Sequence, residues 1–101
     1  MNKQTFIGNL SFDAKAGKIN NIDYVSFPVA CNSGYGEKKK TEFLDCIKFG
    51  ASSRLVDILK KGTKVYASGD CWTETFEGKD KRKVRLDTLE ILGQRGSVEN
   101  I

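Results

Sequence analysis

Apolar and polar residues alternate in several segments of this chain, and this alternation constrains the fold more than any other feature of the sequence. Val25, Phe27 and Val29 occupy every second position of one segment. Leu44 and Cys46 do the same in another. Successive side chains of a strand point to opposite faces, so a period of two is typical of strands that turn one face to a core. The chain is therefore expected to be built mainly from strands.

The order of the elements follows from the same patterns. Five strands are predicted, at residues 4–12, 22–31, 41–49, 64–76 and 82–92. One helix is predicted over residues 51–61, because Leu55, Ile58 and Leu59 recur at helical spacing and a serine at position 52 or 53 can cap its start. Turns or loops are expected where the sequence is polar and contains glycine, at residues 13–21, 32–40 and 77–81.

Three strands, a helix and two more strands, in that order, are typical of the OB-fold, a small five-stranded Greek-key barrel. The predicted fold class is therefore all-β with one helix. Because the chain has only 101 residues, a single domain is expected. This domain is predicted to span residues 1–93, and residues 94–101 are expected to be a short C-terminal tail.

Charge and residue usage narrow the function. The chain has 17 Lys and Arg against 13 Asp and Glu, and this net charge of +4 permits binding to a polyanion. Histidine is absent, which excludes Ser–His and Cys–His nucleophile pairs and His-ligated zinc. Carboxylates on predicted strands, such as Asp45 and Glu74, are interpreted as solvated. No catalytic residue, metal or cofactor is predicted, and the protein is not expected to be an enzyme.

The cysteines indicate the compartment. Cys31, Cys46 and Cys71 are an odd number at wide spacing, and no C-x-x-C sequence occurs. They are interpreted as free thiols in a reducing cytosol rather than as a disulfide framework. The N-terminus has no apolar signal segment, and no apolar run approaches the ~20 residues that span a bilayer. A cytoplasmic protein without a membrane partner is expected.

Several aromatic residues are predicted to lie outside the core. Tyr35 lies between two glycines in a basic loop, and Phe76 ends a strand beside a basic turn. Phe43 shares a strand face with Asp45, so this face is expected to be wet. Proteins that bind single-stranded nucleic acid combine aromatic platforms with a cationic groove. Half-buried strands also favour aromatic residues, which leaves a core position as the alternative for each. The predicted stacking residues are Tyr35, Phe43, Phe49, Trp72 and Phe76.

Cations gather in three places along the sequence. The groups are Lys38, Lys39 and Lys40, then Lys60, Lys61 and Lys64, then Lys79, Lys81, Arg82 and Lys83. A single group of this kind is usually a solvated surface. Three groups, two of them near aromatic residues, favour a groove for nucleic acid in which lysines contact phosphates.

Six short blocks of sequence follow one another along the chain in a characteristic order. They are Asn2-Lys3, Ile7-Gly8-Asn9-Leu10, Val29-Ala30, Thr41-Glu42-Phe43, Phe49-Gly50 and LKKGTKVY at residues 59–66, followed by Gly69. In their order and spacing, from residue 2 to about residue 92, these blocks resemble the bacterial single-stranded DNA-binding protein family.

The resemblance implies an OB-fold that assembles as a homo-oligomer, usually a tetramer and otherwise a dimer. It also implies binding of single-stranded DNA without strong sequence preference during replication, recombination or repair. Base stacking is implied at Tyr35, Phe43, Phe49 and Phe76. Phosphate contacts are implied at Lys3, Lys48 and Lys61.

The chain departs from the family pattern at several points. Asp45 and Glu74 stand where arginine is frequent, which is expected to weaken phosphate binding or shift the DNA path. Leu44 replaces a histidine that often lies between subunits. The Gly-rich linker and acidic tip of cellular members are missing after residue 93. Recruitment of replication proteins by the usual route is therefore not expected, as in a phage or mobile-element member or a truncated chain.

Three alternatives remain open at this point. The first is an OB-fold protein that binds RNA or serves as a primosome accessory. The second is a protein-interaction module in which the lysines only solvate the surface. The third is a nuclease in which Asp45 and Glu74 hold Mg²⁺.

Overall fold

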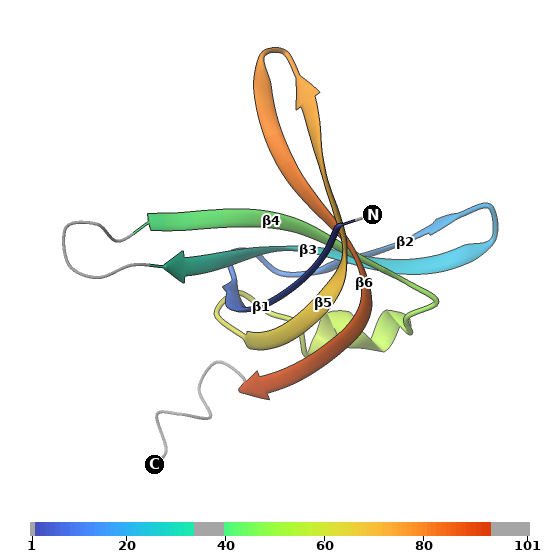
Figure 1. Cartoon of the computed structure of the whole chain (residues 1–101). Coiled ribbons are helices and arrows are strands. Elements are labelled where there is room, and N and C mark those ends of the chain that lie inside the picture. The colour runs from blue at the N-terminus through green and yellow to red at the C-terminus, as the bar shows by residue number, and fades with distance from the viewer. Residues whose placement is uncertain (1, 34–39, 94–101) are drawn as a thin grey trace.

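The computed structural model describes residues 2–33 and 40–93, most of which lie in strands. Six strands and one short 3₁₀ helix follow one another along this described part of the chain (Figure 1). They are β1 (Asn2–Leu10), β2 (Lys15–Ile19), β3 (Ile22–Ser33), β4 (Lys40–Phe49), η2 (Ser53–Asp57), β5 (Lys64–Phe76) and β6 (Lys79–Gly93).

The strands form one sheet that closes on itself. Its order is β1-β5-β6-β4-β3-β2, and a further pairing of β1 with β3 joins five of the strands into a ring. β2 pairs only with β3 among the described strands and so lies outside this ring. β4 and β6 run parallel, whereas the other neighbours are antiparallel. The β5–β6 hairpin projects from the body of the ring (Figure 1).

The core fills the inside of the ring. Alternate residues of the strands supply it, as the sequence pattern predicts, and Val25, Leu44, Val65 and Val84 are almost completely buried. The other buried members are Phe6, Leu10, Ala14, Phe27, Val29, Cys46, Ala51, Leu59, Ala67, Cys71 and Leu86. The remaining alternate positions of the strands are left to face outward, and on that side the candidate site is found.

β2 was not predicted from the sequence. Residues 15–19 contain two lysines and a glycine and show no apolar alternation, which is why they were interpreted as part of a turn. They form a strand because their backbone pairs with β3, from Lys15 opposite Ser26 to Ile19 opposite Ile22. The turn consists only of Asn20 and Asn21, which both have positive φ, as a two-residue hairpin turn requires.

The prediction of a helix over residues 51–61 is wrong, because the structure has only the short 3₁₀ helix η2 at Ser53–Asp57. Ser52 caps the short η2 helix through a hydrogen bond from the Arg54 amide, as expected for a helix start. After η2, the backbone bonds to β1 and the connection that follows it. The Leu59 carbonyl accepts from the Ala14 amide at 2.9 Å, and the Gly62 amide donates to the Leu10 carbonyl at 2.8 Å. These groups are therefore not free to continue an α-helix.

Two other strand boundaries differ from those predicted from the sequence, and both affect the site. The turn predicted at residues 77–81 contains only Glu77 and Gly78, which both have positive φ. Lys79 is already paired with Phe76, so the cations that follow the turn lie on a strand rather than in a loop. At the N-terminus, β1 ends at Leu10, and Phe12 lies in the connection to β2 instead of in the predicted first strand.

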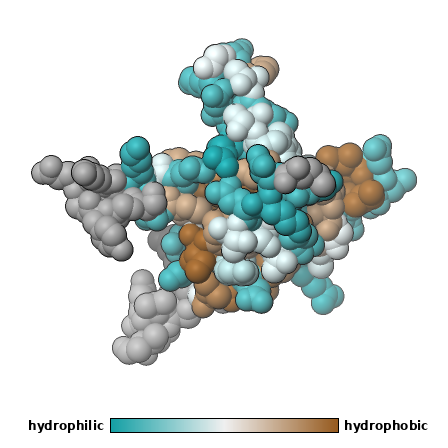
Figure 2. All heavy atoms as spheres, in the orientation of Figure 1, coloured by the Kyte–Doolittle hydropathy of each residue, from teal (hydrophilic) through white to brown (hydrophobic). Residues whose placement is uncertain are grey.

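The surface of the molecule is mixed. In Figure 2 the strongly hydrophobic residues lie in separate patches among hydrophilic ones. No helix in the described residues is long and apolar enough to span a bilayer.

We expect Gly69→Ala to lower the free energy of unfolding by about 1–3 kcal/mol, the range for overpacking. Gly69 lies at a register shift in the β5–β6 ladder, where a Cβ atom would overlap the carbonyl group of Arg85. Urea denaturation at fixed protein concentration measures the change. Gly93→Ala is the control, because a Cβ atom there meets no atom within 4 Å. Equal stability of the two variants would contradict this account.

Candidate nucleic-acid interface

Four of the aromatic residues predicted to bind bases are exposed in the structure. β4 carries Phe43 and Phe49, and β5 carries Trp72 and Phe76. The exposed fractions of these residues are 59%, 37%, 41% and 71% in that order. A core position, the alternative left open by the sequence, is therefore excluded for them. Tyr35, Lys38 and Lys39 lie outside the described residues.

Strand register places these aromatic residues on one face of the sheet. Asp45 of β4 is opposite Lys83 of β6, which in turn is opposite Trp72 of β5. Paired residues in neighbouring strands project to the same side, and the side alternates along each strand. Phe43 and Phe49 therefore share the side of Asp45, and Phe76 shares the side of Trp72. We call this surface the aromatic face.

A row of cations runs along β6 on the aromatic face. Its members occupy every second position and are Lys79, Lys81, Lys83 and Arg85. Their partners across β5 are, in the same order, Phe76, Glu74, Trp72 and Asp70. Sequence reasoning identified the three lysines but missed Arg85. The period of two that starts at Lys79 is the signal that would have found it.

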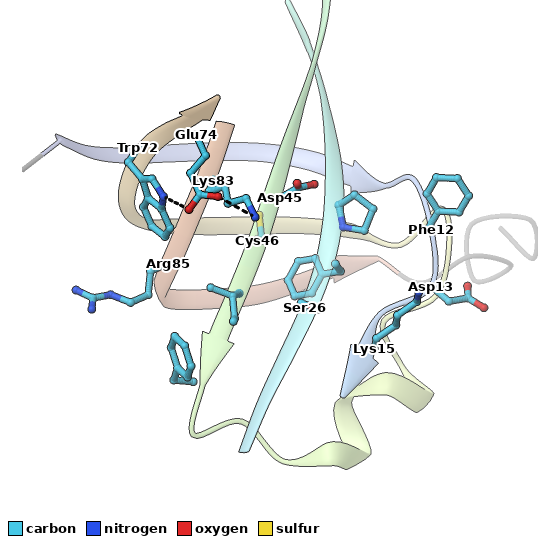
Figure 3. A pocket seen from close by; sticks show the side chains of 14 residues that line it. Phe12, Asp13, Lys15, Ser26, Asp45, Cys46, Trp72, Glu74, Lys83 and Arg85 are labelled. Carbon is cyan, nitrogen blue, oxygen red and sulfur yellow. Dashed lines mark hydrogen bonds and ion pairs between the residues drawn. The ribbon is translucent and has the colours of Figure 1, made fainter. Parts of the chain in front are cut away.

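A groove of about 820 Å³ is hollowed into this surface (Figure 3). β3 and β4 contribute Ser26, Ile47 and Phe49 to its lining. Trp72 and Glu74 lie at one end, and Phe12, Asp13 and Lys15 of the β1–β2 connection lie at the other (Figure 3). The groove thus reaches beyond the strands that sequence reasoning had assigned to the site.

The groove is electrostatically balanced. Its lining holds the cations of Lys15, Lys83 and Arg85, and the carboxylates of Asp13, Asp45 and Glu74. Two of those carboxylates, at positions 45 and 74, are the departures from the family pattern. Electrostatic attraction for a phosphate chain is therefore weaker here than the overall net charge of +4 suggests.

Glu74 joins two of the predicted site residues. Its Oε1 accepts a hydrogen bond from Nε1 of Trp72 at 3.1 Å, and its Oε2 lies 3.4 Å from Nζ of Lys83 (Figure 3). The hydrogen bond from Trp72 and the interaction with Lys83 both hold the pKa of Glu74 below its usual value. The Glu74 carboxylate thus orients the indole ring of Trp72 and, at the same time, pairs with the ammonium group of Lys83.

The ring of Phe49 is held from the side. Tyr24, its partner on the neighbouring strand β3, contacts it edge-on, with ring centroids 6.1 Å apart and planes at 61°. Such T-shaped pairs contribute about 0.5–1.5 kcal/mol beyond area burial. Tyr24 lies over Gly17 of β2, where any Cβ atom would overlap the phenol ring. The glycine therefore leaves room for the ring that supports Phe49.

Two predicted phosphate contacts lie at a second hollow. Lys3 of β1 and Arg82 of β6 line it together with Trp72, which also lines the groove. Lys3 forms an ion pair with Asp87, and this contact raises the pKa of Lys3 and lowers that of Asp87. Arg82 donates to Gln4 and lies 3.5 Å from a carboxylate oxygen of Glu42. Both cations are thus already engaged by neighbours.

The other predicted cations are spread around the ring. Lys40 begins β4 and is exposed. Lys48 lies on the side of β4 opposite to Phe49, by the alternation of the strand. Lys61 follows η2, and its backbone amide donates to Oδ1 of Asp13 at 2.8 Å, next to the Phe12 end of the groove. Lys40 and Lys48 do not line the groove.

The model of the single-strand binding protein family matches residues 1–95. The chain belongs to that family. The OB-fold and the family inferred from the sequence are thereby confirmed, although the structure has one more strand and less helix than expected.

A relative supports the family assignment, and a solved structure supports the fold. The single-stranded DNA-binding protein of Onion yellows phytoplasma (strain OY-M) is 30% identical over 105 residues, which cover 94% of this chain and 97% of the relative. The crystal structure of the small single-stranded DNA-binding protein from Streptomyces coelicolor superposes with a TM-score of 0.70 at 18% identity. The match covers 90% of this chain and 95% of the Streptomyces coelicolor chain, and at that identity it shows the fold alone.

The single-strand binding protein family binds DNA and is non-catalytic. Asp45 and Glu74, which a nuclease would need for Mg²⁺, belong to no cluster of three metal-ligating side chains within residues 2–33 and 40–93. Burial raises the pKa of the Cys46 thiol well above its usual value, which keeps this residue as an inert part of the core.

We expect acid titration of Trp72 fluorescence to show a transition with a midpoint below 4.5, the ordinary pKa of glutamate. The Glu74 carboxylate stays charged down to its lowered pKa. As the pH falls through that value, the charge-assisted hydrogen bond that it accepts from the indole is weakened and its ion pair with Lys83 is lost. Trp72 is the one tryptophan of the chain, so its emission reports the contact directly.

The control for this titration is Glu74→Gln, which keeps an acceptor for the indole but does not titrate. Any transition that this variant retains is acid unfolding. If the variant and the original protein give identical curves, Glu74 does not control the environment of Trp72.

Proposed function

We propose that this protein binds single-stranded DNA with little sequence preference and protects it in the cytoplasm during replication, recombination or repair. The observation that supports this most is the aromatic face, on which exposed rings and a row of cations lie side by side. Membership of the single-strand binding protein family supports it independently. The name of the phytoplasma relative favours DNA over the alternative of RNA.

Base stacking supplies most of the affinity in this proposal. Each base of an unpaired strand can stack on an aromatic ring, which contributes about 1–3 kcal/mol and tolerates any sequence, because every base has a π-face. Phe43, Phe49, Trp72 and Phe76 offer such rings, and we assign the same role to Tyr35. The bases of a duplex are stacked on one another, so they cannot use these platforms. Selectivity for single strands follows from this difference.

Phosphate contacts supply the rest. Lys79, Lys81 and Lys83 alternate along β6 beside the rings, and each phosphate that a lysine neutralises releases a counterion. Glu74 competes for Lys83, because its carboxylate is already 3.4 Å from the ammonium nitrogen. We assign supporting roles to the cations away from the groove, which are Lys3, Lys38, Lys39, Lys40, Lys48, Lys61 and Arg82.

We further propose that the protein works as a homo-oligomer, either a tetramer or a dimer. We assign the contact between copies to the outer side of β1, where Ile7 is 52% exposed. In such an assembly several aromatic faces act on one DNA strand, and the affinity rises through their effective concentration.

We expect Phe76→Ala to weaken binding to oligo-dT at least about tenfold, the low end of the contribution of one stacked base. Phe76 is 71% exposed at the end of β5, so the substitution should leave folding unchanged. Fluorescence anisotropy of labelled oligo-dT measures the dissociation constant. Leu92→Ala is the control, since Leu92 is also exposed but lies near the far end of β6. Unchanged affinity of the Phe76 variant would remove this ring from the site.

We expect Lys81→Gln to make the dependence of binding on salt shallower. One lost phosphate contact reduces the slope of log K against log salt by about 0.7 for a single strand. The slope comes from anisotropy titrations at several salt concentrations. Lys64→Gln serves as the control, because Lys64 begins β5 at the end remote from Trp72. Equal slopes for both variants would show that the β6 row does not contact phosphates.

A further inference from the structure

One exposed aromatic residue has no role in the site as described so far. Phe12 lies between β1 and β2, outside every strand, and is 68% exposed. The family resemblance assigned it nothing, and the sequence pattern placed it at the end of a strand. Single exposed apolar residues are common on protein surfaces, so exposure alone assigns no role to Phe12. Its anchored position in the groove is the observation that does.

The backbone around Phe12 is fixed on both sides. The Ser11 amide donates to the Pro28 carbonyl at 3.0 Å, and the Ala14 amide donates to the Leu59 carbonyl at 2.9 Å. The side chains of Leu10 and Ala14 are buried in the core. The connection is therefore anchored, while the ring of Phe12 itself points away from the core.

Phe12 also lines the same groove as Phe49 and Trp72. In Figure 3 its ring lies at the end of the groove opposite Trp72, with Lys15 below it. Lys15 is paired with Ser26, which is paired with Ile47 on the aromatic face. The groove thus presents a ring and a cation at this end too, which is the combination that a single strand requires.

We propose that Phe12 is a further base-stacking residue and Lys15 a further phosphate contact, so that the bound strand continues from the aromatic face across β3 to the β1–β2 connection. This inference rests on the proposed function. Asp13 lies beside both residues, but its Oδ1 accepts the hydrogen bond from the Lys61 amide, which offsets part of its negative charge. Because the connection is anchored, a base that stacks here meets a ring that loses little freedom.

The first test compares dissociation constants for a series of oligo-dT lengths. We expect Phe12→Ala to weaken binding to long oligonucleotides about tenfold, and Lys15→Gln to make the salt dependence shallower by about 0.7 in slope. In Phe12→Ala, affinity should also stop increasing at a shorter oligonucleotide, because one end of the path is missing. Ile19→Ala is the control, an exposed apolar residue of β2 that does not line the groove.

The second test detects stacking directly. Trp72→Phe removes the one tryptophan, and Phe12→Trp in that background places a reporter at the proposed site. Oligo-dT should quench this tryptophan, whereas Ile19→Trp in the same background should stay unquenched. The double variant should bind oligo-dT like Trp72→Phe alone, because a tryptophan ring also stacks.

The outcomes separate the inference from the function on which it rests. If the unsubstituted protein does not bind oligo-dT, the proposed function fails. If it binds and Phe12→Ala binds equally well, with no quenching at position 12, only the role of Phe12 is overturned. A changed mass in sedimentation equilibrium with unchanged affinity overturns it too, because Phe12 would then lie between subunits.

Discussion

The parallel pairing of β4 with β6 is the contact on which the aromatic face depends. It joins two segments that are far apart in the chain, in a register from Leu44 opposite Arg82 to Ile47 opposite Arg85. Beneath the face, the same register brings Cys46 against Val84 in the core. A slip by one residue would turn the apolar set outward, so the buried side chains fix the position of the exposed ones. The packing inside the ring thus determines which rings and cations meet outside it.

Stacking and charge contribute unequally to this surface. The cations of the groove are matched by as many carboxylates, and Lys83 and Arg85 already have acidic partners, Glu74 at 3.4 Å and Asp70 at 3.0 Å. Exposed ion pairs of this kind are worth little to stability, so they can be exchanged for phosphates at small cost. Among the aromatic pairs of residues 2–33 and 40–93, the one contact to these rings is that of Tyr24 with Phe49, which is edge-on. In the proposed binding mode, affinity therefore comes more from unpaired bases than from phosphates, which favours a single strand over a duplex.

Local sequence patterns predicted the parts of the fold that depend on local physics. Alternation in β3 and β4 correctly assigned which residues face the core, because the period of a strand is a property of its own backbone. The β2 strand and the short η2 helix could not be found in this way, since their conformations depend on hydrogen bonds to β3 and to the β1–β2 connection. The same limit applies to the site. Phe43 and Phe76 were identifiable from their neighbours in sequence. The groove position of Phe12 depends on β3, β4, β5 and β6, which only the fold brings together with the β1–β2 connection.

The aromatic platforms also differ in how firmly they are held, and this affects what each can contribute. Phe49 is supported on one side by Tyr24, which lies over Gly17, so its ring is more constrained than a ring without such a neighbour. Phe76 lies at the tip of a projecting hairpin and is far more exposed. Ordering a mobile side chain on binding costs about 0.5–1.5 kcal/mol, which reduces the net gain from a stacked base. In the proposed binding mode, a base on Phe49 therefore gains more from equal contact, while the reach of the hairpin would let Phe76 engage a strand that approaches from outside the groove.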